Sequence, residues 1–444
     1  MENGQHTRWQ RPETMVWVGI ILREAAIFIG HTYRISKLEG SFGFGWETGR
    51  IARSIALGQG FSSPFQPGTG PTAWLAPIYP YLLAGVFKIF GVYTTRSAIA
   101  ILSINSVFSA LTIFPVFYIA KRAFGMKAAV WSGWLAAALP YAWYWAIKWA
   151  WETSLATLLL TSVLLLSMAM AGVAATGKRE WEFSPRARAS DWLLLGFVWG
   201  LIALVNPSLL LWLPFSGLWL LIAQMKAGDR RALGQALAAA VVFAAVLSPW
   251  VVRNYRVFHR FIPVRGNFGA ELRMGNAEDA VGLWRFWMHP SSNVLEFQKY
   301  KQMGEVAYVQ QKRRDAINFI RTHPARFATL CLRRAIYYWY GTPRDTGVEV
   351  LTASRNIGFL LSSILAFLGL WSMWRESNPA TFLFGSLLLA APLIYYVTFP
   401  HPRYRAPIEP VMLILMVGLF LSVQPRHRTP GVAKELAAFK SEPS

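Results

Sequence analysis

Two carboxylates stand where the chain passes from a polar stretch into an apolar one. Glu47 begins the stretch ETGRIARSIA, in which Ile51 and Ile55 fall on one face of a predicted amphipathic helix and the arginines on another. Glu152 begins the apolar run WETSLATLLL. A carboxylate at the mouth of an apolar helix can accept a proton, because a low dielectric raises its pKa. Glu47 is therefore a candidate general base, with Glu39 as a competitor, although a helix N-terminus also favours an acidic residue for its dipole.

Glu152 has two interpretations. In the first, Glu152 has a structural role only: Lys148 precedes it by four residues, and the two side chains form an ion pair along a helix. A second carboxylate on the same side as Glu47 also suits acid–base or cation chemistry. We expect Glu152 to orient a reacting group or to help bind a divalent cation, with Lys148 in support, and the need for a metal stays open.

A second group of residues suits a phosphate. The stretch HPRYRAP holds two arginines separated by one residue, and guanidinium groups bind phosphate through two parallel N–H donors. A similar basic stretch, SPWVVRNYRVF, places Arg253 and Asn254 at the end of an apolar run. The alternative is generic anchoring at the membrane interface. We predict that a phosphate site draws on His401, Arg403, Tyr404, Arg405 and Arg253, with Asn254 as support.

The elements that position these residues are predicted to be membrane-spanning helices. Of 444 residues, 54% are hydrophobic and 15% are charged, against about 25% charged in soluble domains. Apolar runs of about 20 residues, the length that crosses a bilayer, recur along the chain. The net charge of +22 is assigned to cytoplasmic loops and anionic lipid, not to nucleic acid. The single cysteine, Cys331, excludes an internal disulfide and a cysteine metal cluster.

Charge predicts the topology. Short basic loops stay on the cytoplasmic side, and here they are KRAF, GKREWEFSPRARASD, KAGDRR and the tail QPRHR. They agree with one another only if the short, proline-opened run 79–90 does not cross the bilayer. We therefore predict an all-α polytopic protein with about ten spans, interfacial helices in the first outer loop and both termini inside, the N-terminal span being a retained anchor. Arg23 and Glu24, inside the first span, are expected to pair within the bundle or to face a wet cavity.

The same pattern divides the chain into segments. We predict a transmembrane module at 1–252 that contains the first outer loop at 31–97. An extracytoplasmic segment at 253–355 with a helix break at Pro324 follows, then transmembrane helices at 356–425 and a cytoplasmic tail at 426–444. No nucleotide-binding loop, zinc-spaced ligand set or nucleophile elbow occurs.

Six stretches resemble the GT-C superfamily of membrane glycosyltransferases, in particular the bacterial protein O-mannosyltransferases and the lipid A aminoarabinose transferases. In order they are ETGRIARSIALGQGFSSPF, GPTAWLAPIYPYLLAGVFKIFG, YIAKRAFGMKAAVWSGWLAAALP, WETSLATLLLTSVLLL, SPWVVRNYRVFHRFIPVRGNFGAELRMGN and HPRYRAPIEP. Many relatives carry an acidic residue where Phe44 and Gly45 stand, and Arg-Pro in place of Asn206-Pro207. Glu47 is the best match to the acidic residue of their first outer loop.

The resemblance implies an inverting glycosyltransferase, of the hexosyl- or pentosyltransferase type, in a bacterial inner membrane with its active site outside. It implies a polyprenyl-phosphate sugar donor and an acceptor hydroxyl on a protein, lipid or glycan. Glu47 would be the base, and Arg403 and Arg405, with Arg253, would hold the phosphate. The alternative function is a lipid-linked glycan transporter or flippase, but transporters more often show internal repeats and charges near the midplane of the membrane.

Overall fold

The structure is a computed structural model that describes residues 8–38, 41–177, 179–343 and 349–423. Within these ranges, six helices are long and apolar enough to cross a membrane: Thr95–Phe124, Thr153–Met170, Pro207–Lys226, Ala232–Phe258, Thr352–Arg375 and Pro402–Val423. Three apolar helices are shorter: Ile78–Phe90, Ala189–Val205 and Thr381–Val397. A helical membrane protein is thus confirmed, whereas the count of about ten spans stays a prediction.

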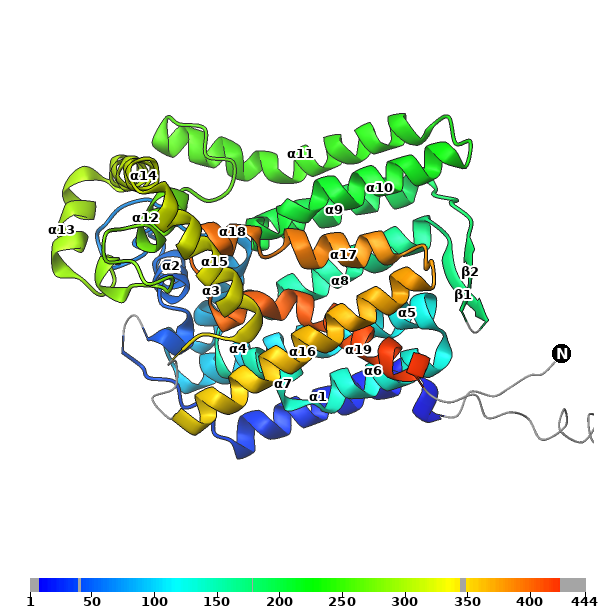
Figure 1. Cartoon of the computed structure of the whole chain (residues 1–444). Coiled ribbons are helices and arrows are strands. Elements are labelled where there is room, and N and C mark those ends of the chain that lie inside the picture. The colour runs from blue at the N-terminus through cyan, green and yellow to red at the C-terminus, as the bar shows by residue number, and fades with distance from the viewer. Residues whose placement is uncertain (1–7, 39–40, 178, 344–348, 424–444) are drawn as a thin grey trace, which may run out of the picture.

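The first half of the chain forms a helical bundle and one hairpin (Figure 1). Its helices are α1 (Pro12–Ile29), α2 (Glu47–Ala56), α3 (Ile78–Phe90), α4 (Thr95–Leu111), α5 (Ile113–Phe124), α6 (Met126–Ala138), α7 (Pro140–Lys148), α8 (Thr153–Met170), α9 (Ala189–Val205), α10 (Leu213–Lys226) and α11 (Ala232–Phe258). Strands β1 (Val173–Gly177) and β2 (Glu180–Phe183) pair antiparallel. This hairpin is a correction to the all-α prediction.

The second half completes the bundle and adds a cap, which is the name used here for residues 268–322 (α12 to α14). Its helices are α12 (Phe268–Gly275), α13 (Val294–Met303), α14 (Glu305–Thr322), α15 (Pro324–Tyr340), α16 (Glu349–Arg375), α17 (Thr381–Ala390), α18 (Leu393–Val397) and α19 (Glu409–Val423). Short 3-10 helices include η3 (Pro207–Trp212), η4 (Phe286–Met288) and η5 (Pro402–Ile408). The predicted break at Pro324 is confirmed, because α14 ends and α15 begins there.

The two ends of the bundle differ in content. Figure 1 shows α2, α12, α13 and α14 gathered at one end and the hairpin β1–β2 at the other, where the first described residues also lie. Arg122, at the end of α5, donates a hydrogen bond from Nη1 to the Val173 carbonyl at 2.8 Å. The Trp181 ring N–H also donates to the Ala123 carbonyl at 2.7 Å, so the basic stretches at 121–122 and 179–188 share one end, as the charge pattern predicts. The tail beyond residue 423 lies outside the described residues.

The apolar run at 128–145, expected to form one span, is broken, and a buried arginine fills the break. Pro140 lacks an N–H donor, so α6 ends and α7 begins after the extended residue Leu139. The guanidinium of Arg23 donates to the freed carbonyls of Ala136 and Ala137, at 3.0 and 3.3 Å. A cation suits the C-terminus of a helix, where carbonyls lack partners. Arg23 thus pairs with backbone carbonyls inside the bundle.

The cap is fixed to the first outer loop by a buried carboxylate. Glu305, at the start of α14, accepts hydrogen bonds from the Ala73 backbone N–H at 2.6 Å, from the Tyr300 hydroxyl at 2.8 Å and from the Thr72 hydroxyl. Burial raises the pKa of Glu305, and these donors oppose the rise. The cap and the loop are thereby held as one surface around α2.

Candidate active site

Glu47 is placed by a strained turn at the start of α2. Trp46, the residue before it, has φ 45°, a conformation that a bulky residue rarely adopts. Its ring packs against Phe42, Trp284 and His289, with centroids 5.0, 5.4 and 6.3 Å away. These aromatic contacts hold the turn, so the first side chain of α2 has a fixed direction.

The same turn explains a departure from the GT-C pattern. Gly45 has φ 79°, and a Cβ there would lie 2.7 Å from the Ala150 carbonyl oxygen. Phe44 is buried against Phe87 and Tyr93. Neither position accommodates a charged side chain, which leaves Glu47 as the acidic residue of this turn. The competing Glu39 lies outside the described residues.

Glu47 contacts a histidine from the cap. Its Oε1 lies 3.1 Å from His289 Nε2. Burial raises the pKa of Glu47, whereas the positive charges of Arg50, Arg403 and Arg265 act in the opposite direction. Burial also lowers the pKa of His289 to about 4, so this imidazole is neutral at physiological pH. A carboxylate with a raised pKa beside a neutral donor is well suited to general-base chemistry.

Arg403 carries the positive charge on the other side of this site. Its guanidinium carbon lies 3.9 Å from the centroid of the Trp151 ring, and Nη1 lies 3.9 Å from Glu152 Oε2. The second distance exceeds a hydrogen bond. Stacking on Trp151 and attraction to Glu152 therefore hold the guanidinium. The structure thus brings together Glu47, Glu152 and Arg403 from three distant parts of the sequence.

His401 and Tyr404 support Arg403. His401 Nδ1 accepts the Arg403 backbone N–H at 3.2 Å and caps η5. Burial lowers the pKa of His401 to about 3, so it is neutral and offers no positive charge to a phosphate. The Tyr404 ring stacks on Tyr395 with centroids 4.3 Å apart.

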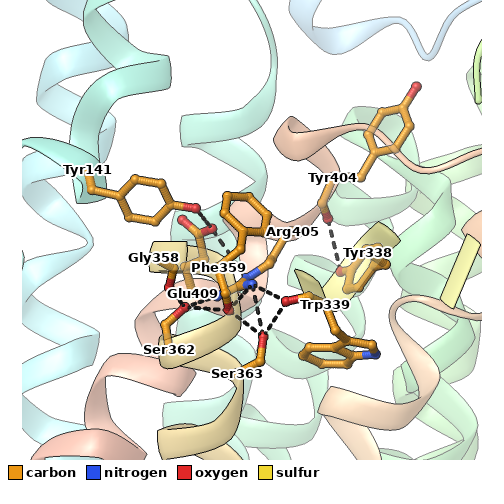
Figure 2. A network of polar contacts seen from close by, with 10 residues as sticks. All are labelled: Tyr141, Tyr338, Trp339, Gly358, Phe359, Ser362, Ser363, Tyr404, Arg405 and Glu409. Atoms are coloured by element: carbon orange, nitrogen blue, oxygen red, sulfur yellow. Dashed lines mark hydrogen bonds and ion pairs between the residues drawn. The ribbon is translucent and has the colours of Figure 1, made fainter. Parts of the chain in front are cut away.

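Arg405 points away from Arg403 into the bundle. Figure 2 shows its guanidinium surrounded by α16 and the start of α19. It donates to the carbonyls of Trp339 and Phe359 and to the hydroxyls of Ser362 and Ser363, and it lies 3.6 Å from Glu409. Its side chain is 1% exposed. These contacts do not fit the predicted role in phosphate binding, and Arg405 is assigned to the packing of η5.

The remaining predicted residues also have structural contacts. Arg253 donates to the carbonyls of Phe61 and Thr72 at 2.8 and 2.7 Å, and so joins α11 to the first outer loop. Asn254 is buried and donates to the Ile262 carbonyl at 2.9 Å. Lys148 is exposed and lies over the Trp149 ring. α7 ends at Lys148 and α8 begins after Glu152, so the two are not on one helix.

Three residues that act on Glu47 were not predicted from the sequence: Arg50, Arg265 and His289. Arg50 lies one turn after Glu47 and donates to Ser291 at 3.0 Å. Arg265 lies 3.4 Å from Glu271. His289 belongs to the cap. The only local signal was the three-residue spacing of Glu47 and Arg50, because the other contacts join segments far apart in the chain.

A metal ion held by the protein alone needs several ligating side chains close together. Among the described residues, no group of three or more His, Cys, Asp or Glu side chains is placed to hold a metal ion.

Comparison with known proteins gives the fold. No protein-family model and no curated sequence matches the chain. ArnT of Cupriavidus metallidurans, solved bound to undecaprenyl phosphate, is similar with a TM-score of 0.51 and 15% identity, covering 96% of this chain and 62% of ArnT. The Archaeoglobus fulgidus oligosaccharyltransferase AglB, solved with an inhibitory peptide and a dolichol-phosphate, gives a TM-score of 0.53 and 14% identity, covering 98% of this chain and 52% of AglB.

Both neighbours are GT-C glycosyltransferases. The chain has the GT-C fold. This confirms at the level of the fold the resemblance seen in six stretches of the sequence. The chain spans less than two thirds of the length of either neighbour, and at 14–15% identity the likeness concerns the fold alone.

Proposed function

We propose that the protein transfers a sugar from a polyprenyl-phosphate donor to an acceptor hydroxyl, with inversion at the anomeric carbon. The observation that carries this proposal is the half-buried Glu47 carboxylate, which feels the positive charges of Arg50, Arg403 and Arg265 at one end of a GT-C bundle. A base beside a cationic pocket suits the attack of a neutral hydroxyl on a sugar with an anionic leaving group. Both neighbours were solved with a polyprenyl-type phosphate, which supports the donor class.

The proposed step uses groups already in place. Glu47 takes the proton of the acceptor hydroxyl as its oxygen attacks the anomeric carbon. The bond from that carbon to the phosphate oxygen breaks, and polyprenyl phosphate leaves with the electron pair. Arg403, with Arg265, stabilises the charge that grows on the leaving phosphate. Glu152 holds Arg403 in place, and the cap around α12–α14 covers the site and contributes to acceptor choice.

We place this end of the bundle outside a bacterial inner membrane, with both termini inside and about ten spans in total. The support is the separation of the site from the basic loops, which favour the cytoplasmic side. The donor's tail would stay in the bilayer while its head group reaches the site. The clustering of Glu47, Glu152 and Arg403 at one end also favours an enzyme over the alternative of a transporter, which more often places its functional charges near the midplane.

The test uses purified protein in vesicles with a panel of radiolabelled polyprenyl-phosphate sugars and candidate acceptors. The proposal predicts labelled acceptor and released polyprenyl phosphate in equal amounts with at least one donor. If no donor is consumed, but a labelled lipid-linked sugar crosses the vesicle bilayer, the transporter replaces the enzyme.

A further inference from the structure

The proton on the His289 ring can be assigned from its two neighbours. His289 Nδ1 accepts the Ser291 backbone N–H at 3.2 Å. A backbone N–H is always a donor, so Nδ1 must be the unprotonated nitrogen. The neutral ring then carries its proton on Nε2, which lies 3.1 Å from Glu47 Oε1. The protonated nitrogen of His289 is therefore the one in contact with an oxygen of the carboxylate.

The plane of this ring is fixed by aromatic neighbours. His289 is 4% exposed, and its ring meets Phe65 and Trp74 edge-on, at interplanar angles of 87° and 77°, and lies more nearly parallel to Trp46, at 24°. Phe65 and Trp74 lie in the first outer loop, after α2, and Trp46 directly precedes α2. A rotation of the imidazole away from Glu47 would require these rings to move.

A second contact ties the same cap residues to α2. Arg50 Nη1 donates to the Ser291 hydroxyl at 3.0 Å, so residues 289–291 meet the first turn of α2 at two points. The cap, which follows α11, thus contributes directly to the surroundings of the proposed base. Displacement of residues 289–291 would remove both contacts at once.

We infer that His289 is a positioning residue for Glu47: its Nε2–H holds Oε1, so that Oε2 is directed to the acceptor hydroxyl. The inference rests on the proposed role of Glu47 as the base. A donor to a carboxylate also favours the ionised form, the form that accepts a proton. It follows that the base is fully formed only while the cap residues 289–291 are docked on α2.

Three substitutions separate positioning from packing. His289→Gln places an amide N–H near the position of Nε2, His289→Asn places one near Nδ1 instead, and His289→Ala has neither. The Asn and Ala variants should lose about 10²-fold in kcat, the effect of a misplaced catalytic group, with KM for both substrates unchanged. His289→Gln should recover most of the loss. Loss of kcat in all three to the same degree, or a change in KM alone, would show a structural role.

The pH profile gives a second readout. The charged groups acting on Glu47 are Arg50, Arg265 and Arg403, and those acting on His289 are Glu271 and Arg50. All remain in the variants, so only the lost donor changes. Without it the ionised form of Glu47 is less stable, and the acid limb of kcat/KM should move up by about one pH unit in His289→Asn. An unmoved limb contradicts the inference.

A measurement that needs no activity separates this inference from the proposed function. A carbodiimide reacts with protonated carboxyl groups in apolar surroundings, so labelling of Glu47 against pH, followed by peptide mass spectrometry, reports its protonation. The midpoint should rise by about one pH unit in His289→Asn, or in His289→Ala if the Asn variant does not fold, with Glu47→Gln as the unlabelled control. If the midpoint rises but wild-type protein transfers no sugar, the positioning stands and the proposed function fails. If the midpoint stays, the positioning fails.

Discussion

Replacing Arg405 with methionine should destabilise the protein without weakening donor binding. The guanidinium is buried and donates to two carbonyls and two hydroxyls, and it lies 3.6 Å from Glu409. Methionine fills similar space but leaves Glu409, which is 12% exposed, without its cation. Removing one partner of a buried pair costs about 3–5 kcal/mol in the free energy of unfolding. We expect a loss of this size in Arg405→Met.

The assay is unfolding of the purified protein by SDS titration, with donor KM measured on the folded fraction. The matched control is the double variant Arg405→Met/Glu409→Met, which removes both charges and should recover most of the loss. The donor KM should equal that of the wild type in both variants. An Arg405→Met protein of wild-type stability with a raised donor KM would refute the reasoning and return Arg405 to the phosphate site.

Three further predictions concern the site, the cap and the topology. Arg403→Lys keeps the charge but loses the planar fork, and it should raise the donor KM about tenfold, the effect of one charge-assisted hydrogen bond; an unchanged donor KM would count against Arg403 as the phosphate ligand. Glu305→Ala leaves the Thr72 hydroxyl and the Ala73 N–H without their acceptor and should speed hydrogen exchange of residues 294–322, whereas unchanged exchange would mean that other contacts hold the cap. A cysteine at position 95 should react with an impermeant reagent from outside and one at position 126 should not, and the reverse pattern would invert the topology.

The helices were predictable because their signal is local. Apolar runs of bilayer length mark α8 and α11 directly, and the spacing of Ile51 and Ile55 marks α2. The hairpin β1–β2 was missed because each strand is short and its charged residues read as a loop. The interruption at Leu139 was missed because the apolar character continues through Pro140, and only the packing of Arg23 shows how the break is satisfied.

The predicted site residues do not all face one another, and the separation of Arg405 from Arg403 has a geometric cause. Two closely spaced arginines bind one phosphate only if both point to one side. In the 3-10 helix η5, three residues complete a turn, so residues two apart point in different directions. Arg403 therefore faces Glu152 while Arg405 enters the bundle. His289 was missed because its contact with Glu47 is formed only by tertiary folding, and no periodic pattern around it marks a site.

The rate of sugar transfer by the Glu47→Gln protein decides whether Glu47 is the base of a polyprenyl-phosphate-dependent transfer. Glutamine keeps the size of the side chain and can still hydrogen-bond, but it cannot take a proton. We expect a loss of about 10²–10⁴-fold in kcat with the fold intact, while Glu39→Gln, from the same loop, transfers sugar at the wild-type rate. For the wild type, the rate should fall at acid pH, with a midpoint above the ordinary glutamate pKa, because burial raises the pKa of Glu47. Wild-type transfer by Glu47→Gln would contradict the account, and Glu39 or Glu152 would then have to supply the base.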